Sequence, residues 1–258
     1  MAEHLTMAVA DGVACITLSR PPANAFDLAL SRELGEAVRE AGERDDIGAI
    51  VLTGGRRLFA AGADLKGLAT ATSAEAKPQV DALGGACDLL EAIPKPSVAA
   101  INGYALGGGL EVALACDLRI AAEDAQLGQP EIRIGVIPGA GGTQRLVPVI
   151  GRGRASDLVL TGRSVDAAEA LRIGLVDRVV GPDEVLDAAL ELARGFAAGP
   201  RAALAAAKRA LRAAVEVPGA EGIAEERALF LQLFATADQR EGMAAFLEKR
   251  PPVFGADA

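Results

Sequence analysis

The chain of 258 residues is 51% hydrophobic and 24% charged, and it carries a net charge of −9. This length and composition suit one large folded core and exclude a disordered chain. The acidic balance, without any dense basic run, argues against a protein that binds nucleic-acid phosphates.

The first half of the chain alternates predicted strands and helices. Strands are expected at 5–9 and 12–18, joined by the hairpin turn signal Asp11-Gly12, and a helix is expected at 28–44. The next expected elements, in chain order, are a buried strand at 47–52, a loop rich in glycine and alanine at 59–64, a helix at 73–93 interrupted at Pro78, a buried strand at 97–101, a short helix at 110–116 and a strand at 118–122.

The second half of the chain becomes progressively helical. Helices are expected over parts of 140–160 and 165–173, followed by a short strand at 175–180. From Pro182 to Lys249 the composition predicts an all-helical region of three or four helices, packed on its own domain or on a neighbouring subunit. The alternation of strands and helices before this region predicts an α/β domain with crossover connections.

Histidine and cysteine chemistry is scarce in this sequence. The single histidine is His4, beside the N-terminus, which excludes Ser-His-Asp, Cys-His and histidine-rich metal sites. The three cysteines lack CxxC spacing, and neither a signal peptide nor an apolar run of about 18 residues is visible. We therefore expect free thiols, a cytoplasmic protein, no membrane span and no metal. Carboxylates, backbone amides or a cofactor must carry any catalysis.

Two segments rich in small residues are expected to expose backbone amides. The first is 59–64, where small side chains allow close approach to another group. The second is Gly107-Gly108-Gly109, which precedes a helix and would aim amides from its positive end, with Glu111 on the same side of the first turn. No Gly-Lys-Ser/Thr follows, so a P-loop is excluded. Taken locally, the segments also fit a tight turn and an ordinary helix start.

A third segment brings a second acidic residue into apolar surroundings. Gln129-Pro130-Glu131 is followed by a glycine-rich stretch at 135–142, which suggests either a buried carboxylate with a perturbed pKa or a surface turn. The stretch at 151–156 is similar to a dinucleotide fingerprint but lacks its last glycine. Two amide sites and two carboxylates together suit thioester chemistry, in which amides hold an enolate oxygen and carboxylates move protons.

Five motifs, in order and spacing, make the whole chain resemble the crotonase superfamily, and within it the enoyl-CoA hydratases. They lie at 59–66, 101–111, 129–132, 137–146 and 246–254. The resemblance implies an α/β fold, a spiral of ββα units over 1–195 that carries the CoA-binding and catalytic site. A C-terminal helical oligomerisation region over 196–258 would follow, and the implied assembly is a homotrimer or a homohexamer built as a dimer of trimers.

The resemblance also implies individual site residues. The amides of Ala61 and Gly108 would form an oxyanion hole for the thioester carbonyl, and Glu111 and Glu131 match the two catalytic glutamates. Gly139 matches a residue whose backbone helps to place the second glutamate. The other residues expected near the CoA are Ala23, Ala25, Ala63, Asp64, Leu65 and, from the C-terminal tail of the same subunit or its neighbour, Phe246 and Lys249.

The implied activity is the reversible syn addition of water to trans-2-enoyl-CoA, giving 3-hydroxyacyl-CoA in fatty acid β-oxidation or related acyl-CoA catabolism. No cofactor is expected, because the coenzyme A belongs to the substrate. Two alternatives stay open. A Δ3,Δ2-enoyl-CoA isomerase of the same superfamily commonly uses one carboxylate and often lacks an acid that matches Glu111. A non-catalytic or RNA-binding homologue is the other alternative, and both the acidic charge and the complete motif set argue against it.

Overall fold

The computed structural model describes residues 3–255, and its N-terminal strands form the predicted hairpin. Strands β1 (Leu5–Ala10) and β2 (Val13–Leu18) pair antiparallel, with Ala10 opposite Val13. Asp11 and Gly12 both adopt positive φ, at 52° and 73°, which is the conformation that a two-residue hairpin turn requires.

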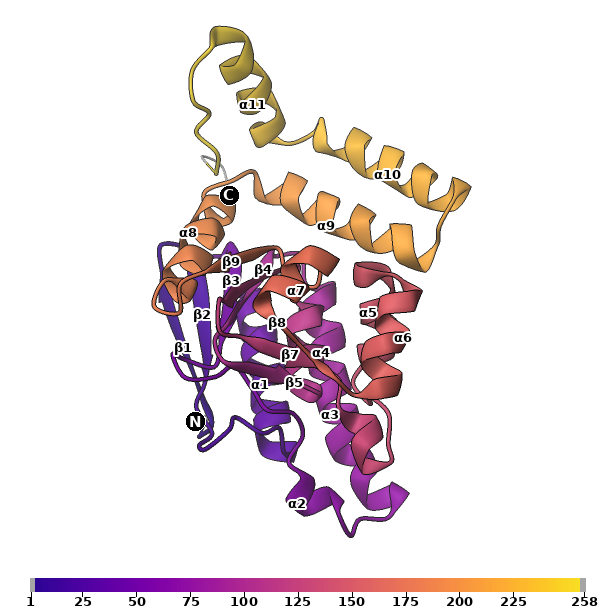
Figure 1. Ribbon diagram of the computed structural model, residues 1–258. Coiled ribbons are helices and arrows are strands. Elements are labelled where there is room, and N and C mark those ends of the chain that lie inside the picture. Colours follow the sequence, from indigo (N-terminus) through magenta and orange to yellow (C-terminus); the bar gives the residue numbers. More distant parts are fainter. Residues whose placement is uncertain (1–2, 256–258) are drawn as a thin grey trace.

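The main sheet continues from this hairpin as a set of parallel strands (Figure 1). Within residues 3–255 it has six strands in the order β1-β2-β3-β4-β6-β9. The four strands that follow β2 are β3 (Ala49–Thr53), β4 (Ser97–Ile101), β6 (Leu118–Ala122) and β9 (Arg178–Val180). Every residue of β3 and β4 is buried, because helices cover the parallel part of the sheet. Helix α8 (Val185–Ala197) packs across β2, β3, β4 and β6.

A second, smaller sheet was not predicted from the sequence. Strands β5 (Tyr104–Leu106) and β7 (Gln126–Gly128) pair in parallel, and β8 (Ser164–Asp166) pairs antiparallel with β7. Each strand has only three residues, too few to show a period of two. β5 follows β4 and leads into α4 (Gly108–Ala115), so these elements make one turn of the expected ββα spiral.

Two long helices pack on one another beside the sheet. They are α1 (Leu28–Glu43) and α3 (Ser73–Ala92), and the short α2 (Leu65–Leu68) precedes α3. The predicted interruption of α3 at Pro78 is wrong, since the helix continues through this residue. Pro78 and Ala74 are both exposed, so water can bond the Ala74 carbonyl that the proline leaves without an amide partner. A capping box of Thr72 and Glu75 also starts the helix firmly.

The middle of the chain folds into three helices that lie next to the candidate active site described below. These are α5 (Gly142–Ile150), α6 (Arg152–Thr161) and α7 (Ala167–Ile173). Gly151, at φ 79°, separates α5 from α6. The predicted strand at 175–180 shortens to β9, because Leu175 donates its amide to Ala170 and so still belongs to the turn after α7.

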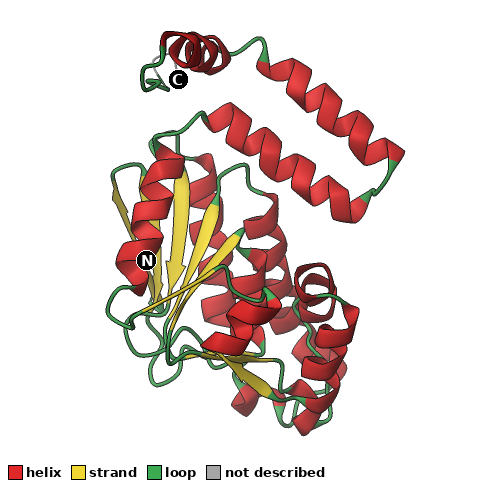
Figure 2. Ribbon diagram, turned by 45° about the horizontal axis from the view of Figure 1, so that its top comes forward, coloured by secondary structure: helices red, strands yellow, loops and turns green. Residues whose placement is uncertain are grey.

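The C-terminal helices extend beyond the body of the molecule (Figures 1 and 2). Helices α9 (Arg201–Glu216) and α10 (Ala220–Leu233) form an antiparallel pair, and α11 (Ala237–Glu248) lies farther out. Lys208 anchors α9 to the body, since its Nζ lies 2.8 Å from Asp117. The expected boundary at 195/196 falls inside α8, which packs on the sheet. Among residues 3–255, every helix is too short or too polar to span a bilayer.

Candidate active site

A cavity of about 610 Å³ opens where the N-terminus of α4 meets the 3-10 helix η1 (Glu131–Ile134). Loop 61–63, α2 and α3 form one wall, and η1 with the loop 136–140 forms the other. Apolar side chains dominate these walls, and the two acidic residues on them are Glu111 and Glu131. The structure thus brings the two predicted glutamates, 20 positions apart in the sequence, to one apolar cavity.

Glu111 occupies the first turn of α4 and is almost completely buried, with 3% of its surface exposed. Its Oε1 accepts hydrogen bonds from the amides of Ala140, at 2.7 Å, and Gly142, at 2.8 Å. Gly142 is the first residue of α5, so the positive end of that helix faces the carboxylate. Burial raises the pKa of Glu111 above its ordinary value, while the two amides act in the opposite direction because they stabilise the charged form.

Glu131 begins η1, on the opposite wall from α3. Burial raises the pKa of this carboxyl group to about 7, and the negative charge of Glu111 adds to the effect. The carboxyl group lies against Gly107, where a Cβ atom would come within 2.7 Å of Glu131 Oε1. With its amide turned so that the nitrogen faces Glu131, Gln129 donates to both carboxyl oxygens, at 3.0 and 3.1 Å. Gln129 is itself completely buried, so it fixes the carboxyl group in place.

The structure corrects the first half of the predicted oxyanion hole. The amide of Ala61 donates to the carbonyl of Ala23 at 3.0 Å and is therefore consumed within the fold. The amide of Ala63 donates to no acceptor within residues 3–255. The same holds for Gly108, the first residue of α4, whose amide has no carbonyl one turn earlier to bind. A Cβ at Gly108 would lie 3.6 Å from the Ala63 nitrogen, so these two free amides are neighbours on the cavity wall.

A short parallel bridge explains why the Ala63 amide is free. Phe26 donates its amide to Gly62, and Asp64 donates its amide to Phe26, both at 2.8 Å. In this pattern the residue between the two bonds, Ala63, turns its own N–H away from the partner segment. The sequence identified the correct loop. The amides along this loop face alternate sides, and this alternation decides which of them faces the cavity.

The remaining predicted CoA contacts divide into two groups. Ala63, Leu65 and Gly139 lie on the cavity wall. Ala23, Ala25 and Asp64 instead frame the adjoining loops. The carbonyl groups of Ala23 and Ala25 accept bonds from Ala61 and Arg20, and the Asp64 carboxylate pairs with Arg20 at 2.7 Å. The guanidinium of Arg20 lowers the pKa of Asp64 below its ordinary value.

Two further expectations concern the backbone of Gly139 and the C-terminal tail. Within residues 3–255, the amide of Gly139 makes no hydrogen bond to Glu131. The amides that hold a glutamate here are those of Ala140 and Gly142, and they hold Glu111. Phe246, near the end of α11, and Lys249, just after it, do not lie on the cavity wall of their own chain, so a contact with the CoA of a neighbouring subunit stays a prediction.

Solved structures share this fold over nearly their whole length. Enoyl-CoA hydratase subunit I of Geobacillus kaustophilus matches with a TM-score of 0.93 and 41% identity, covering 99% of both chains. The enoyl-CoA hydratase of Bacillus anthracis matches with a TM-score of 0.93 and 39% identity, covering 98% of this chain and 99% of its own. The spiral and its C-terminal helices therefore place the protein in the crotonase class of folds.

The sequence comparison narrows this class to a family. The model of the enoyl-CoA hydratase/isomerase family matches residues 8–257, and the chain belongs to this family. A probable enoyl-CoA hydratase of Mycobacterium leprae is 49% identical over 244 residues, which are 94% of each chain. The 2,3-dehydroadipyl-CoA hydratase of Escherichia coli is 46% identical over 247 residues, again 94% of each chain.

Proposed function

We propose that this member of the family is an enoyl-CoA hydratase, which adds water reversibly and on one face to the 2,3 double bond of a trans-2-enoyl-CoA. The product is a 3-hydroxyacyl-CoA, as in fatty acid β-oxidation or related acyl-CoA breakdown. One observation carries the proposal: a buried and a half-buried carboxyl group and two free amides line a single apolar cavity. The hydratases among its relatives support the same conclusion.

The amides of Ala63 and Gly108 would bind the thioester oxygen. Attack of water at C3 pushes electrons into the thioester and makes an enolate, whose negative oxygen is costly to form in water. Two amides that are already fixed in place stabilise this charge without reorganising, and one such donor is typically worth about 10²–10³ in rate. The N-terminus of α4 adds its positive end at Gly108.

The surroundings of the two glutamates favour different roles. Glu111 receives two amide bonds on Oε1, which favour its carboxylate form, so its other oxygen would hold the water and take its proton. Glu131, whose burial raises its pKa to about 7, keeps a proton in part of the molecules at neutral pH and would deliver it to C2. Because both groups line one cavity, water and proton would reach the same face of the double bond.

The isomerase alternative differs in how many carboxylates it needs. Isomerisation carries one proton between C2 and C4, whereas hydration also requires a water held at C3. We expect Glu111→Ala to lower hydration of crotonyl-CoA about 10²-fold or more, and to affect conversion of a 3-enoyl-CoA less. Both reactions are measured on the same variant, so errors in active-site concentration cancel in their ratio.

The matched variant is Glu131→Gln, which should depress both reactions while leaving the affinity for a saturated acyl-CoA near that of the wild type. Equal losses of the two reactions in Glu111→Ala would mean that Glu111 supports the site generally. Unchanged hydration in Glu111→Ala would remove the two-glutamate mechanism and favour the isomerase.

The same proposal covers the surroundings of the enzyme. No cofactor takes part in the steps above, because carboxyl groups and amides supply every proton and every charge. We expect a trimer or a dimer of trimers, in which Phe246 of α11 and Lys249, just after this helix, reach the CoA of a neighbouring subunit. The three free cysteines, Cys15, Cys87 and Cys116, support a reducing, cytoplasmic location without nucleic-acid or membrane partners.

A further inference from the structure

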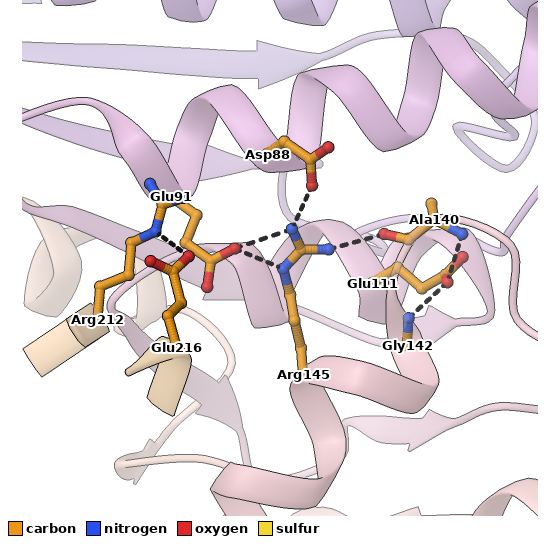
Figure 3. A network of polar contacts seen from close by, with 8 residues as sticks. All are labelled: Asp88, Glu91, Glu111, Ala140, Gly142, Arg145, Arg212 and Glu216. Carbon is orange, nitrogen blue, oxygen red and sulfur yellow. Dashed lines mark hydrogen bonds and ion pairs between the residues drawn. The ribbon is translucent and has the colours of Figure 1, made fainter. Parts of the chain in front are cut away.

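Arg145 of α5 is a nearly buried cation that lies just behind the cavity, with 11% of its side chain exposed. It is not on the cavity wall, so it does not touch the substrate. Its Nε and Nη2 both bind Glu91 Oε2, at 3.0 and 2.9 Å, and Nη2 also binds Asp88 Oδ1 at 2.7 Å (Figure 3). Two acids of α3 therefore fix the guanidinium in one orientation.

The remaining guanidinium nitrogen points at the loop that holds Glu111. Arg145 Nη1 donates to the carbonyl of Ala140 at 2.8 Å, and the amide of the same residue donates to Glu111 Oε1 at 2.7 Å (Figure 3). Ala140 is thus held on both sides, by the arginine and by the glutamate. A continuous series of hydrogen bonds therefore runs from the acids of α3 through Arg145 and the backbone of Ala140 to Glu111.

Gly141 shows that the guanidinium and this loop are fitted closely together. The residue adopts φ 103°, a left-handed conformation that lets the amides of Ala140 and Gly142 converge on one oxygen. A Cβ atom at position 141 would overlap Arg145 Nη1. The loop therefore follows the guanidinium as well as the carboxylate.

We propose that Arg145 is a positioning residue for water addition: by holding the Ala140 carbonyl it keeps the two amides on Glu111 Oε1 and thereby aims the other oxygen of Glu111 at the attacking water. The inference rests on the proposed function, since it concerns the work assigned to Glu111. Misplacing a reacting group by about 1 Å can cost about 10²-fold in rate, so a residue behind the site can control turnover without touching the substrate.

The charge of Arg145 supports the same role. Its positive charge opposes the effect of burial on Glu111 and so lowers the pKa of that carboxyl group. Arginine is suited to the task because its planar fork reaches a carbonyl and two carboxylates at once, which a lysine ammonium cannot do in fixed directions. Removing Arg145 should therefore have two separable effects, one on geometry and one on the proton affinity of Glu111.

The test compares Arg145→Gln and Arg145→Lys with Arg119→Gln. Arg119 is a somewhat more deeply buried arginine that holds the carbonyl groups of Cys116 and Leu175, away from the cavity. We expect Arg145→Gln to lower kcat for hydration about 10- to 100-fold with KM within threefold, and to move the acid limb of the kcat/KM profile to higher pH. Arg145→Lys should restore the pH profile but not kcat. Arg119→Gln should lower the melting temperature and leave kcat and the pH profile unchanged.

Wild-type kcat and pH profile in folded Arg145→Gln would overturn the proposal and leave the arginine as a tie between α3 and α5. If Arg145→Gln does not fold, Glu91→Gln replaces it, because it loosens the anchor of the guanidinium and should lower kcat in the same way. Unchanged kcat in both Arg145→Lys and Glu91→Gln would also refute the positioning role of Arg145.

A readout without turnover separates this proposal from the proposed function. The carboxyl band of Glu111, identified as the infrared band that Glu111→Gln abolishes, is titrated in the wild type and in Arg145→Gln. A higher pKa in the variant supports the link from Arg145 to Glu111 even if the wild type hydrates no enoyl-CoA, a result that would defeat the hydratase assignment and leave only that link. An unchanged titration together with wild-type kcat in Arg145→Gln, in an enzyme that hydrates enoyl-CoA, defeats the positioning role alone.

Discussion

The unlike surroundings of Glu111 and Glu131 predict a bell-shaped pH profile for hydration. The proposed route needs one proton on the pair, on Glu131. Because burial raises the pKa of Glu131 to about 7, kcat/KM should fall as the pH rises through about 7 and the pair loses this proton. It should fall again in acid as Glu111 is protonated, at a pH above the ordinary range for glutamate, since burial raises that pKa too.

Initial rates with crotonyl-CoA over a series of buffers of constant ionic strength measure this profile. The two apparent pKa values belong to the coupled pair rather than to either residue. Glu131→Gln, which cannot release a proton, should lose the alkaline limb. A wild-type kcat/KM that is constant from about pH 6 to about pH 9 would contradict the requirement for one proton on the pair of glutamates.

The choice between Ala61 and Ala63 can be tested at a single backbone atom. Replacing alanine by lactic acid turns its amide into an ester, which removes the N–H and keeps the side chain. At position 63 this change should lower kcat about 10²-fold or more, because an oxyanion donor is lost. At position 61 it should leave kcat nearly unchanged and lower the melting temperature, because that N–H binds the Ala23 carbonyl.

Melting temperature and kcat are therefore expected to separate between the two positions, each serving as the control for the other. A loss of turnover at position 61 with none at position 63 would restore the original assignment.

The residues of the site were predictable to different degrees. Glu111, Glu131 and Gly108 follow from motif resemblance, and the structure places all three on one cavity. The free amide could not be assigned, because a bridge between Phe26 and Ala63, distant in sequence, decides it. Arg145 lies in the motif at 137–146, but its partners Asp88 and Glu91 lie more than 50 positions away, so the spacing within the motif gives no sign of the contact.

At the scale of elements, long periodic or apolar segments were predicted well and short ones were not. The hairpin, α1 and the buried strands β3, β4 and β6 lie close to the predicted ranges. The second sheet was missed because strands of three residues have no readable period, and their stability comes from pairing with distant segments. At Pro78 the sequence predicted a break that the helix does not have, because the exposed carbonyl one turn earlier can bond water in place of the missing amide.

The C-terminal helices present apolar surface that a monomer would leave in water. Phe246 is 83% exposed, Leu247 80% and Leu211 72%, and they lie on α11 and α9. Large exposed apolar side chains gathered in one helical region are typical of an interface between subunits. We therefore expect light scattering at micromolar concentration to give three or six times the chain mass of 26.2 kDa.

Phe246→Asp with Leu247→Asp should lower this mass, since charges would be buried without partners. Glu248→Gln, on the same helix but without apolar contact area, is the matched control and should assemble normally. A wild-type particle of the chain mass would refute the assembly and remove the route by which Lys249 could reach a CoA.

The position of both glutamates on one cavity also constrains how hydration and the reverse reaction, dehydration, are related. Hydration moves a proton from water to Glu111 and another from Glu131 to C2, so the enzyme ends the turnover with the proton on the other carboxyl group. That form is the one from which dehydration starts, and a proton must pass from Glu111 back to Glu131 before the next hydration. No net proton is consumed, so the equilibrium constant does not depend on pH. Detailed balance then requires the kcat/KM profiles of the two directions to have the same shape, with a ratio equal to the equilibrium constant at every pH. No substitution at this pair can make the protein a one-way catalyst, and only the concentrations of the two thioesters set the direction of flux.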